Sequence, residues 1–278
     1  MAAYDGDADA DALAQRLATD GYALVADWLS ADDAARVRLE ANALAFEPSR
    51  VISGGRKVVD AERTDEICWL RGASGHPPAL AGVAARLRAL GRGLGRALAR
   101  LDGRRGAPPA VAAALDRAVA RARVRRQERR PATILADDGD GAAGAPPAMV
   151  ARYADGARFT AHVDAANAGE LPFGTPPDPR VLTAVVYASE PAGGWRPGHG
   201  GVLRVTRPLG APSPGLDVLL PAGADPATLD VPPRRGLLVL FWSALVRHEV
   251  LPAFEERLAL SMWYNEPPPR PTDACSKE

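Results

Sequence analysis

The chain has 278 residues, of which 47% are apolar, and its 34 basic side chains balance 34 acidic ones. That length allows one sizeable hydrophobic core, and the balanced charge gives no reason to expect a nucleic acid partner. The acidic start lacks the basic and apolar segments of a secretory signal, and no apolar run approaches the length of a membrane span. We therefore expect a monomer without a membrane partner, in the cytoplasm, the nucleus or both.

The first part of the chain alternates helix and strand patterns. Leu13 and Leu17 have helical spacing within residues 9–19, and Gly21 follows as a stop signal. Residues 22–29 then predict a strand. We interpret this helix and strand as the start of a mainly helical support for a core that begins much later in the chain.

Two further helices are predicted in this support. Ser30 with Asp33 resembles a helix start, and residues 31–46 continue as an amphipathic helix. A longer helix is predicted over 79–101 from apolar residues at three- and four-residue spacing. These residues are Leu80, Val83, Leu87, Leu90, Leu94 and Leu98.

Residues 102–146 interrupt the pattern with Gly, Pro, Ala and Arg, a composition that argues against a place in the core. The arginine-rich run at 121–130 has two interpretations. It is either a nuclear-import or polyanion-binding patch or, as we prefer, a solvated helix with mixed charges. The Gly/Ala/Pro/Asp part that follows is expected to be a disordered loop.

From Ala148 onward the pattern changes to short apolar strands separated by Gly and Pro, which is typical of an all-β sandwich or barrel. Eight such strands that close on themselves give a double-stranded β-helix, or jelly roll. The predicted fold class is therefore mainly β with supporting helices around a jelly-roll core.

The predicted organisation is one domain over residues 9–266, between a disordered start at 1–8 and a disordered, proline-rich tail at 267–278. This domain has three parts: the helical support at 9–101, the low-complexity insertion at 102–146 and the jelly-roll core at 147–266. The two cysteines, Cys68 and Cys275, are too few for a disulfide framework, so free thiols are expected.

The segment FTAHVDA in the core carries a His-x-Asp pair. In a strand, side chains i and i+2 point to the same face, so His162 and Asp164 should point together. His248, which follows a strongly apolar strand predicted at 237–242, can supply a third ligand. Two neutral imidazoles and one carboxylate leave the opposite metal positions open, as in non-haem Fe(II) oxygenases. The three residues are predicted to hold one iron, whose open positions receive a cosubstrate and dioxygen.

Arg257 lies on the strand that follows a Pro-containing turn after His248. A 2-oxoglutarate bound to the iron through its 1-carboxylate and 2-oxo group would leave its far carboxylate in an apolar barrel. An arginine, whose planar fork matches a carboxylate, suits that group better than a lysine. The alternative without a metal is that these residues are structural: a histidine hydrogen-bonded within the core beside an aspartate that caps a helix or turn.

These residues resemble the prolyl 4-hydroxylase branch of the Fe(II)/2-oxoglutarate dioxygenases, and most closely the intracellular oxygen-sensing prolyl hydroxylases that modify hypoxia-inducible factor. The resemblance covers most of residues 12–102 and 147–266. Segments that look like the family's core strands include AHVD, LLVLFWS, RHEVLPA and RLALSMWY. Upstream, RTDEICWLRG resembles the segment that precedes the family's long supporting helix.

The resemblance implies roles residue by residue. The iron ligands match His162, Asp164 and His248. The groups that line the cosubstrate pocket match Arg257, Tyr187, Tyr153 and Ser261. The positions near the peptide-substrate entrance or beside the iron match Arg180, Asp65, Trp69 and Trp263. Residues 48–62 correspond to a mobile substrate-covering segment, but they differ too much for its specificity to be carried over.

The implied activity is C4 hydroxylation of a prolyl residue in a protein or peptide, with release of succinate and CO2. Fe(II), 2-oxoglutarate, O2 and L-ascorbate are the implied cofactors, and a role in oxygen sensing and the hypoxia response follows from the same resemblance. Two alternatives stay open: a small-molecule hydroxylase of the same fold, and a catalytically silent jelly-roll module that keeps a metal for stability. A zinc enzyme built on the same ligands is a further alternative.

Overall fold

A computed structural model describes most of the chain. The described residues are 6–53, 56–58, 61–71, 75–101, 108–126, 133, 135, 147–165, 178–191, 193–206 and 227–267. Disorder was predicted at 1–8, in the later part of the insertion and at 267–278. Residues 1–5, 136–146 and 268–278 lie outside the described residues, whereas residues 6–8 belong to a helix, so the predicted disordered start was too long. Part of the 48–62 segment also lies outside the described residues.

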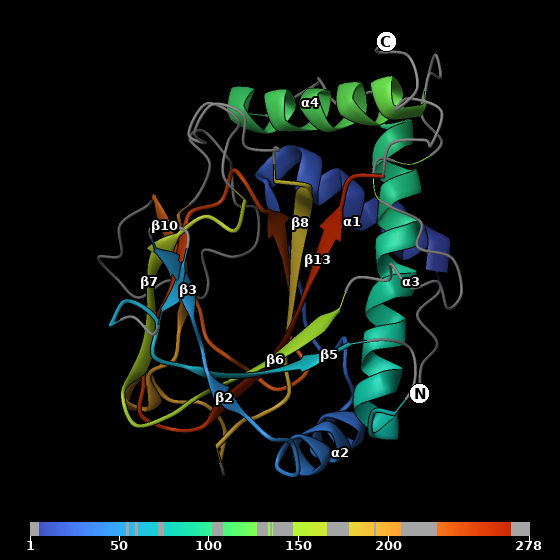
Figure 1. Ribbon diagram of the computed structural model, residues 1–278. Coiled ribbons are helices and arrows are strands. Elements are labelled where there is room, and N and C mark those ends of the chain that lie inside the picture. The colour runs from blue at the N-terminus through green and yellow to red at the C-terminus, as the bar shows by residue number, and fades with distance from the viewer. Residues whose placement is uncertain are drawn as a thin grey trace.

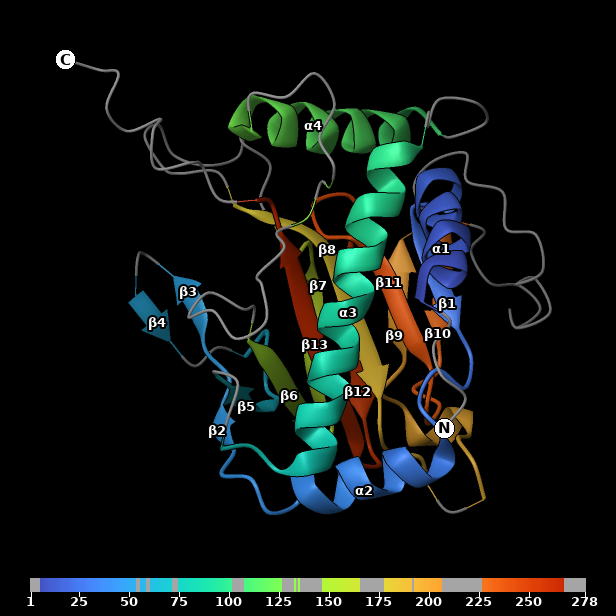
Figure 2. The ribbon, with the colours of Figure 1, turned by 90° about the vertical axis from the view of Figure 1, so that its right-hand side faces the viewer.

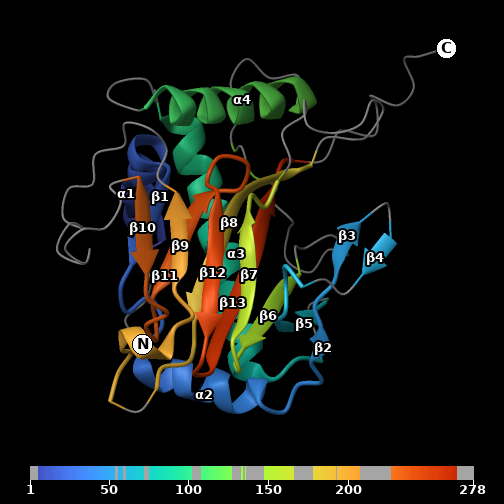
Figure 3. The ribbon, with the colours of Figure 1, turned by 90° about the vertical axis from the view of Figure 1, so that its left-hand side faces the viewer.

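The core is a jelly roll of eight antiparallel strands, as predicted (Figure 3). One sheet contains the order β11-β8-β13-β6, and the facing sheet has the order β10-β9-β12-β7. The strands are β6 (Ala148–Tyr153), β7 (Ala157–His162), β8 (Arg180–Tyr187), β9 (Leu203–Thr206), β10 (Thr228–Val231), β11 (Leu238–Trp242), β12 (His248–Ala253) and β13 (Arg257–Asn265). A short 3-10 helix, η1 (Pro197–His199), precedes β9.

Strands from the first part of the chain extend the first sheet at both edges. β1 (Tyr22–Val25) pairs with β11, while β5 (Glu66–Leu70) pairs with β6 and carries β2 (Glu47–Pro48) outside it. β3 (Val51–Ser53) and β4 (Arg56–Val58) form a separate hairpin. The strand predicted over 22–29 was too long, because Asp27 takes a left-handed conformation with φ 53° and turns the chain after Val25.

Both faces of the first sheet are apolar, because one packs against the helices and the other faces the inside of the barrel. Its strands are therefore nearly continuous apolar runs in the sequence. Along β13, Leu258, Leu260 and Met262 point toward the helices, whereas Ala259 and Trp263 point into the barrel. Arg257 and Ser261 share the parity of the inward-pointing set. This alternation places the cosubstrate residues inside the barrel.

Two helices cover the outer face of the first sheet (Figure 2). α3 (Pro78–Arg100) runs along it and packs against α1 (Gly6–Asp20). All six apolar positions predicted for the long helix are buried. The hydroxyl of Tyr264 on β13 donates to the carbonyl of Leu87, which ties α3 to the sheet at 2.8 Å. The predicted bracing helix is therefore confirmed.

Two glycines of α3 should respond in opposite ways to alanine. A Cβ on Gly91 would lie 2.5 Å from the Tyr264 ring, whereas a Cβ on Gly82 would meet nothing within 4 Å. We expect Gly91→Ala to lower the free energy of unfolding by about 1–3 kcal/mol through overpacking. Gly82→Ala should raise it by about 0.5–1 kcal/mol, because alanine restricts the unfolded chain and favours the helix. Urea unfolding measures both, and equal effects would contradict this packing.

α2 (Ala31–Ala41) begins as predicted, with the Ser30 hydroxyl accepting from the Asp33 backbone N–H at 3.1 Å. It ends earlier than the predicted residue 46. Leu44 and Phe46 instead pack against the hydrophobic core, and the chain must leave the helical path to bring them there. Both side chains are half-buried there.

The insertion contains α4 (Pro109–Arg126), which lies across one end of the barrel (Figure 1). The helix predicted for 121–130 is present up to Arg126, and residues 127–130 lie outside the described residues. The expectation that the insertion stays out of the core was wrong. Val111, Leu115 and Ala118 are buried in the same cluster as α3. Arg121 pairs with the buried carboxylate of Glu266 at 2.5 Å. In the part of the chain that is described, no helix combines the length and apolarity needed to cross a membrane.

Candidate metal centre and cosubstrate pocket

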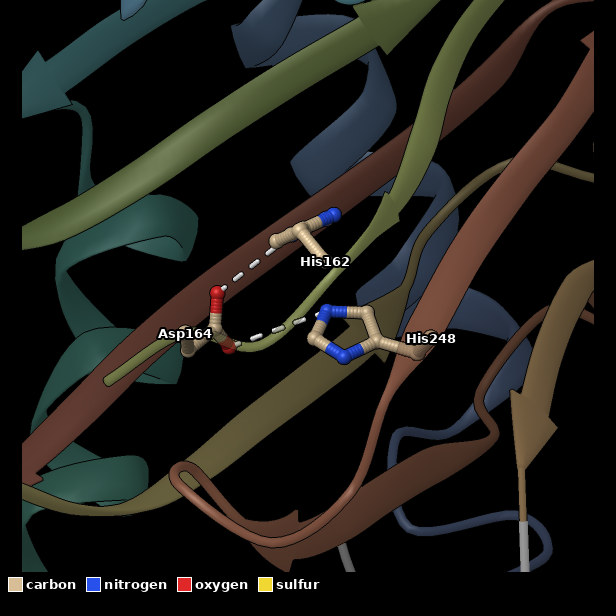
Figure 4. A group of neighbouring side chains, drawn as sticks. All are labelled: His162, Asp164 and His248. Atoms are coloured by element: carbon tan, nitrogen blue, oxygen red, sulfur yellow. Dashed lines mark ion pairs between the residues drawn. The ribbon is translucent and has the colours of Figure 1, made fainter. Parts of the chain in front are cut away.

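His162, Asp164 and His248 meet at the end of the barrel where β7 ends and β12 begins (Figure 4). His162 and His248 are directly opposed in neighbouring antiparallel strands. Their Nε2 atoms lie 3.6 and 3.8 Å from the two carboxylate oxygens of Asp164, and one ligand atom from each residue lies within 4.8 Å of the others. The predicted ligands are therefore brought together.

The route by which Asp164 reaches the site differs from the prediction. β7 ends at His162, so Asp164 lies in the bend that follows and not at position i+2 of a strand. The proline after His248 also differs, because Pro252 lies within β12 and the turn comes later, at Phe254 and Glu255. Neither difference moves a ligand out of the site.

Backbone carbonyls fix the tautomer of both histidines. His162 Nδ1 lies 2.8 Å from the carbonyl oxygen of Thr160, and His248 Nδ1 lies 3.1 Å from that of Val246. A carbonyl can only accept, so each Nδ1 must carry the proton and donate it. In a neutral ring each Nε2 is then the nitrogen left to coordinate a metal, which is the arrangement that orients metal-bound imidazoles.

The charges at the site suit a divalent cation. Burial alone would raise the pKa of Asp164, but the contacts with His162, His248 and the Thr183 hydroxyl outweigh it and hold the pKa below its usual range. Thr183 donates to Asp164 at 2.7 Å, so Ser243, 2.9 Å away, must donate to Thr183. Burial lowers the pKa of His248 and keeps its imidazole neutral. This donor set, two imidazoles and one carboxylate, fits Fe(II) with open positions.

Arg257 is a buried cation inside the same barrel, with 4% of its surface exposed. Among the described residues no carboxylate lies within ion-pair distance of it, and its Nε has no partner. Its Nη2 donates to the Tyr187 hydroxyl at 3.3 Å, and its guanidinium lies over the rings of Tyr153 and Tyr187. A buried unpaired charge costs several kcal/mol, so this group is arranged to receive an anion.

The other predicted cosubstrate residues surround that guanidinium. Tyr153 is opposite Arg257 in the β6–β13 ladder, and burial raises the pKa of both Tyr153 and Tyr187, which keeps their hydroxyls neutral. Ser261 is buried further along β13. Gly201, with φ 69°, lets the backbone approach closely, because a Cβ there would lie 3.1 Å from Arg257 Cδ. A buried guanidinium beside a tyrosine hydroxyl suits the distal carboxylate of 2-oxoglutarate.

Three of the predicted entrance residues form one cluster. The rings of Trp69 and Trp263 lie 5.9 Å apart, and the Arg180 guanidinium lies 5.9 Å from the Trp263 ring. Arg180 is held by a bidentate contact with Asp178, with distances of 3.0 and 2.6 Å. This cluster is joined through β8 to the metal centre, because Thr183 on that strand supports Asp164.

Asp65 was predicted to lie near the peptide-substrate entrance and to bind substrate, but it is buried. Its side chain is 0% exposed and accepts from two nitrogens of Arg63, at 2.8 and 3.1 Å. A carboxylate covered in this way cannot contact a substrate directly. It holds Arg63 and also lies against the Tyr153 hydroxyl.

Arg63 is a residue that the sequence did not single out. Its guanidinium lies 4.6 Å above the Phe159 ring, and Phe159 stacks on the His162 imidazole at 3.6 Å. This stack supports His162, the more exposed of the two histidine ligands. An isolated antiparallel β-bridge between Arg63 and Phe159 brings these two residues together. The two segments are distant in the sequence, so no local pattern could have indicated their pairing.

Residues 148–265 match the family model described as the 2OG-Fe(II) oxygenase superfamily. The match covers all eight strands of the jelly roll and all three candidate metal ligands. No curated protein sequence matches the chain.

Solved structures share the fold over nearly the whole chain. A prolyl-4-hydroxylase from Pseudomonas putida is 24% identical, with a TM-score of 0.60, 93% of this chain covered and 100% of the other. A prolyl hydroxylase from Trichoplax adhaerens, solved with a peptide fragment of a hypoxia-inducible factor, is 18% identical, with a TM-score of 0.52 and coverage of 94% and 90%. At these identities the likeness establishes the fold.

Proposed function

We propose that this protein is an Fe(II)- and 2-oxoglutarate-dependent dioxygenase that hydroxylates a carbon of its substrate. One observation carries the proposal: a His-Asp-His cluster and a buried arginine that has no carboxylate partner among the described residues lie in the same jelly roll. A metal site kept only for stability would not need the second feature. The overall reaction converts substrate C–H, O2 and 2-oxoglutarate into substrate C–OH, succinate and CO2.

The chain's own residues bind, orient and exclude water. His162, Asp164 and His248 would hold Fe(II), which supplies the activation of O2 when bound. Arg257, with the Tyr187 hydroxyl, would hold the distal carboxylate of 2-oxoglutarate and so fix the distance of its 2-oxo group from the metal. The Thr183–Ser243 pair keeps the Asp164 carboxylate in place.

We further propose that the substrate is a prolyl residue of a protein or peptide, hydroxylated at C4, and that the enzyme serves in oxygen sensing with ascorbate as a reductant. The support is the resemblance of the strand and entrance segments to oxygen-sensing prolyl hydroxylases, together with the fold shared with the Pseudomonas putida and Trichoplax adhaerens proteins. Arg180, Trp69 and Trp263 are the proposed peptide contacts.

Succinate formation tests the proposal. Anaerobically prepared protein is given Fe(II), ascorbate and 2-oxoglutarate and is then exposed to air. We expect slow succinate formation without any substrate, because cosubstrate turnover is only partly coupled to hydroxylation. Proline-containing peptides should accelerate it, whereas free amino acids and lipids should not; the opposite preference would favour a small-molecule hydroxylase. Absence of both succinate and 2-oxoglutarate binding would contradict the proposed function and favour a silent metal-binding module.

A further inference from the structure

A pocket outside the metal centre is lined by residues of α4 and of the end of the barrel. α4 lies across that end of the barrel (Figure 1). The pocket's volume of about 50 Å³ is room for a few waters or one small charged group. Arg117 and Arg121, one helical turn apart, line it from α4. Asp178, Arg180 and Glu266 line it from the ends of the barrel strands. The insertion therefore builds a polar pocket that the jelly roll alone would not have.

The charges of this pocket do not cancel. Arg121 pairs with Glu266, whose side chain is 3% exposed, and this contact fixes α4 on the barrel. Arg180 pairs with Asp178 through two contacts. Arg117 has no hydrogen bond or ion pair within the part of the chain that the structure describes. Among the described residues that line the pocket, three arginines face two carboxylates, which leaves one positive charge unmatched.

The pocket is also next to the metal centre. Ala165 lines it and directly follows the ligand Asp164, and the Ala165 backbone N–H donates to the Ser243 carbonyl at 3.0 Å. Arg180 lines the pocket and also belongs to the entrance cluster, where its guanidinium lies against the Trp263 ring. It is also close enough to Asp164 for the two charges to interact. A substrate held at the entrance cluster could extend a neighbouring side chain into the pocket.

We propose that this pocket binds a carboxylate side chain of the substrate, so that the enzyme prefers an acidic peptide with Asp or Glu close to the target residue. This proposal rests on the proposed oxygenase function. Arg117 is the specificity-determining residue, because it is the cation of the pocket without a partner among the described residues. A carboxylate there would neutralise the pocket and accept charge-assisted hydrogen bonds.

Direct binding of labelled peptides tests this specificity. Short peptides carry one proline, and a single Asp or Glu is moved through the flanking positions, with Asn or Gln as matched neutral forms. Affinities are measured by fluorescence anisotropy in the absence of O2, on protein loaded with Mn(II) and 2-oxoglutarate, so that no turnover occurs. At one position we expect the acidic peptide to bind about five- to tenfold more tightly than its amide form. This preference should decrease as the salt concentration is raised.

Two variants of α4 separate a specific contact from general charge. Arg117→Gln should abolish the preference for the acidic peptide, and Arg117→Lys should keep part of it. Arg123→Gln removes the same charge from an exposed position of the same helix that does not line the pocket, and it should leave the preference unchanged. Both arginines are exposed, so the variants should fold like the wild type.

The proposed acidic subsite can be disproved independently of the proposed oxygenase function. If peptides bind without any preference for Asp or Glu, or do not bind at all, while the wild type still forms succinate in air, the acidic subsite is overturned. Equal loss of preference in Arg117→Gln and Arg123→Gln would also overturn it, since the effect would then be long-range charge. Failure of the proposed function is recognised separately, by absence of both 2-oxoglutarate binding and succinate.

Discussion

Asp164→Asn is expected to weaken divalent metal binding by at least about 100-fold and to reduce succinate formation below detection. Loss of a supporting contact typically costs 10–100-fold in metal affinity, and removal of a charged ligand should cost more. The amide keeps the shape of the side chain and can still accept from Thr183, so the fold should survive. Mn(II) titration followed by electron paramagnetic resonance measures binding without relying on turnover.

Asp230→Asn is the matched control for this variant. Asp230 lies on β10 and pairs with Arg204 on β9, away from the three ligands, so both metal binding and succinate formation should stay at the wild-type level. If Asp164→Asn retained wild-type Mn(II) affinity, the three residues would not form the metal site. Thermal unfolding of both variants without metal checks that the difference is not one of folding.

Arg257→Met is expected to weaken 2-oxoglutarate binding by about 100-fold or more, with little effect on metal affinity. The guanidinium is the buried cation above Tyr153 and Tyr187, and a contact worth about 3 kcal/mol corresponds to that loss. Methionine has a similar length and no charge. Calorimetric titration of the Mn(II)-loaded protein with 2-oxoglutarate measures the affinity directly.

Stability gives a second and independent readout for Arg257. Because a buried charge without a carboxylate partner is costly, the methionine variant should unfold at the same or a higher temperature than the wild type when 2-oxoglutarate is absent. Saturating 2-oxoglutarate should raise the unfolding temperature of the Mn(II)-loaded wild type but not that of the variant. If the ligand stabilised both proteins equally, its distal carboxylate would not bind at Arg257.

The sequence by itself determined the core strands and the inward-facing chemistry. Alternation along β13 places Arg257 on the barrel face, and helical spacing makes Leu87 and its companions the buried face of α3. The order of the His-x-Asp pair, the distant His248 and Arg257 indicated one site, because neighbouring strands of a jelly roll bring such segments together. These features have a period or a fixed order, so they can be read along the chain.

Only the tertiary structure decided the features that depend on contacts between distant segments. α2 ends at Ala41 and Phe46 packs beyond it against the core, while Asp65 is covered and holds Arg63. The stack of Arg63 and Phe159 on His162, and the position of α4 across the end of the barrel, have no local signal. Side-chain periodicity reports which face of an element is buried, whereas the partner that covers that face is set by packing of the whole chain.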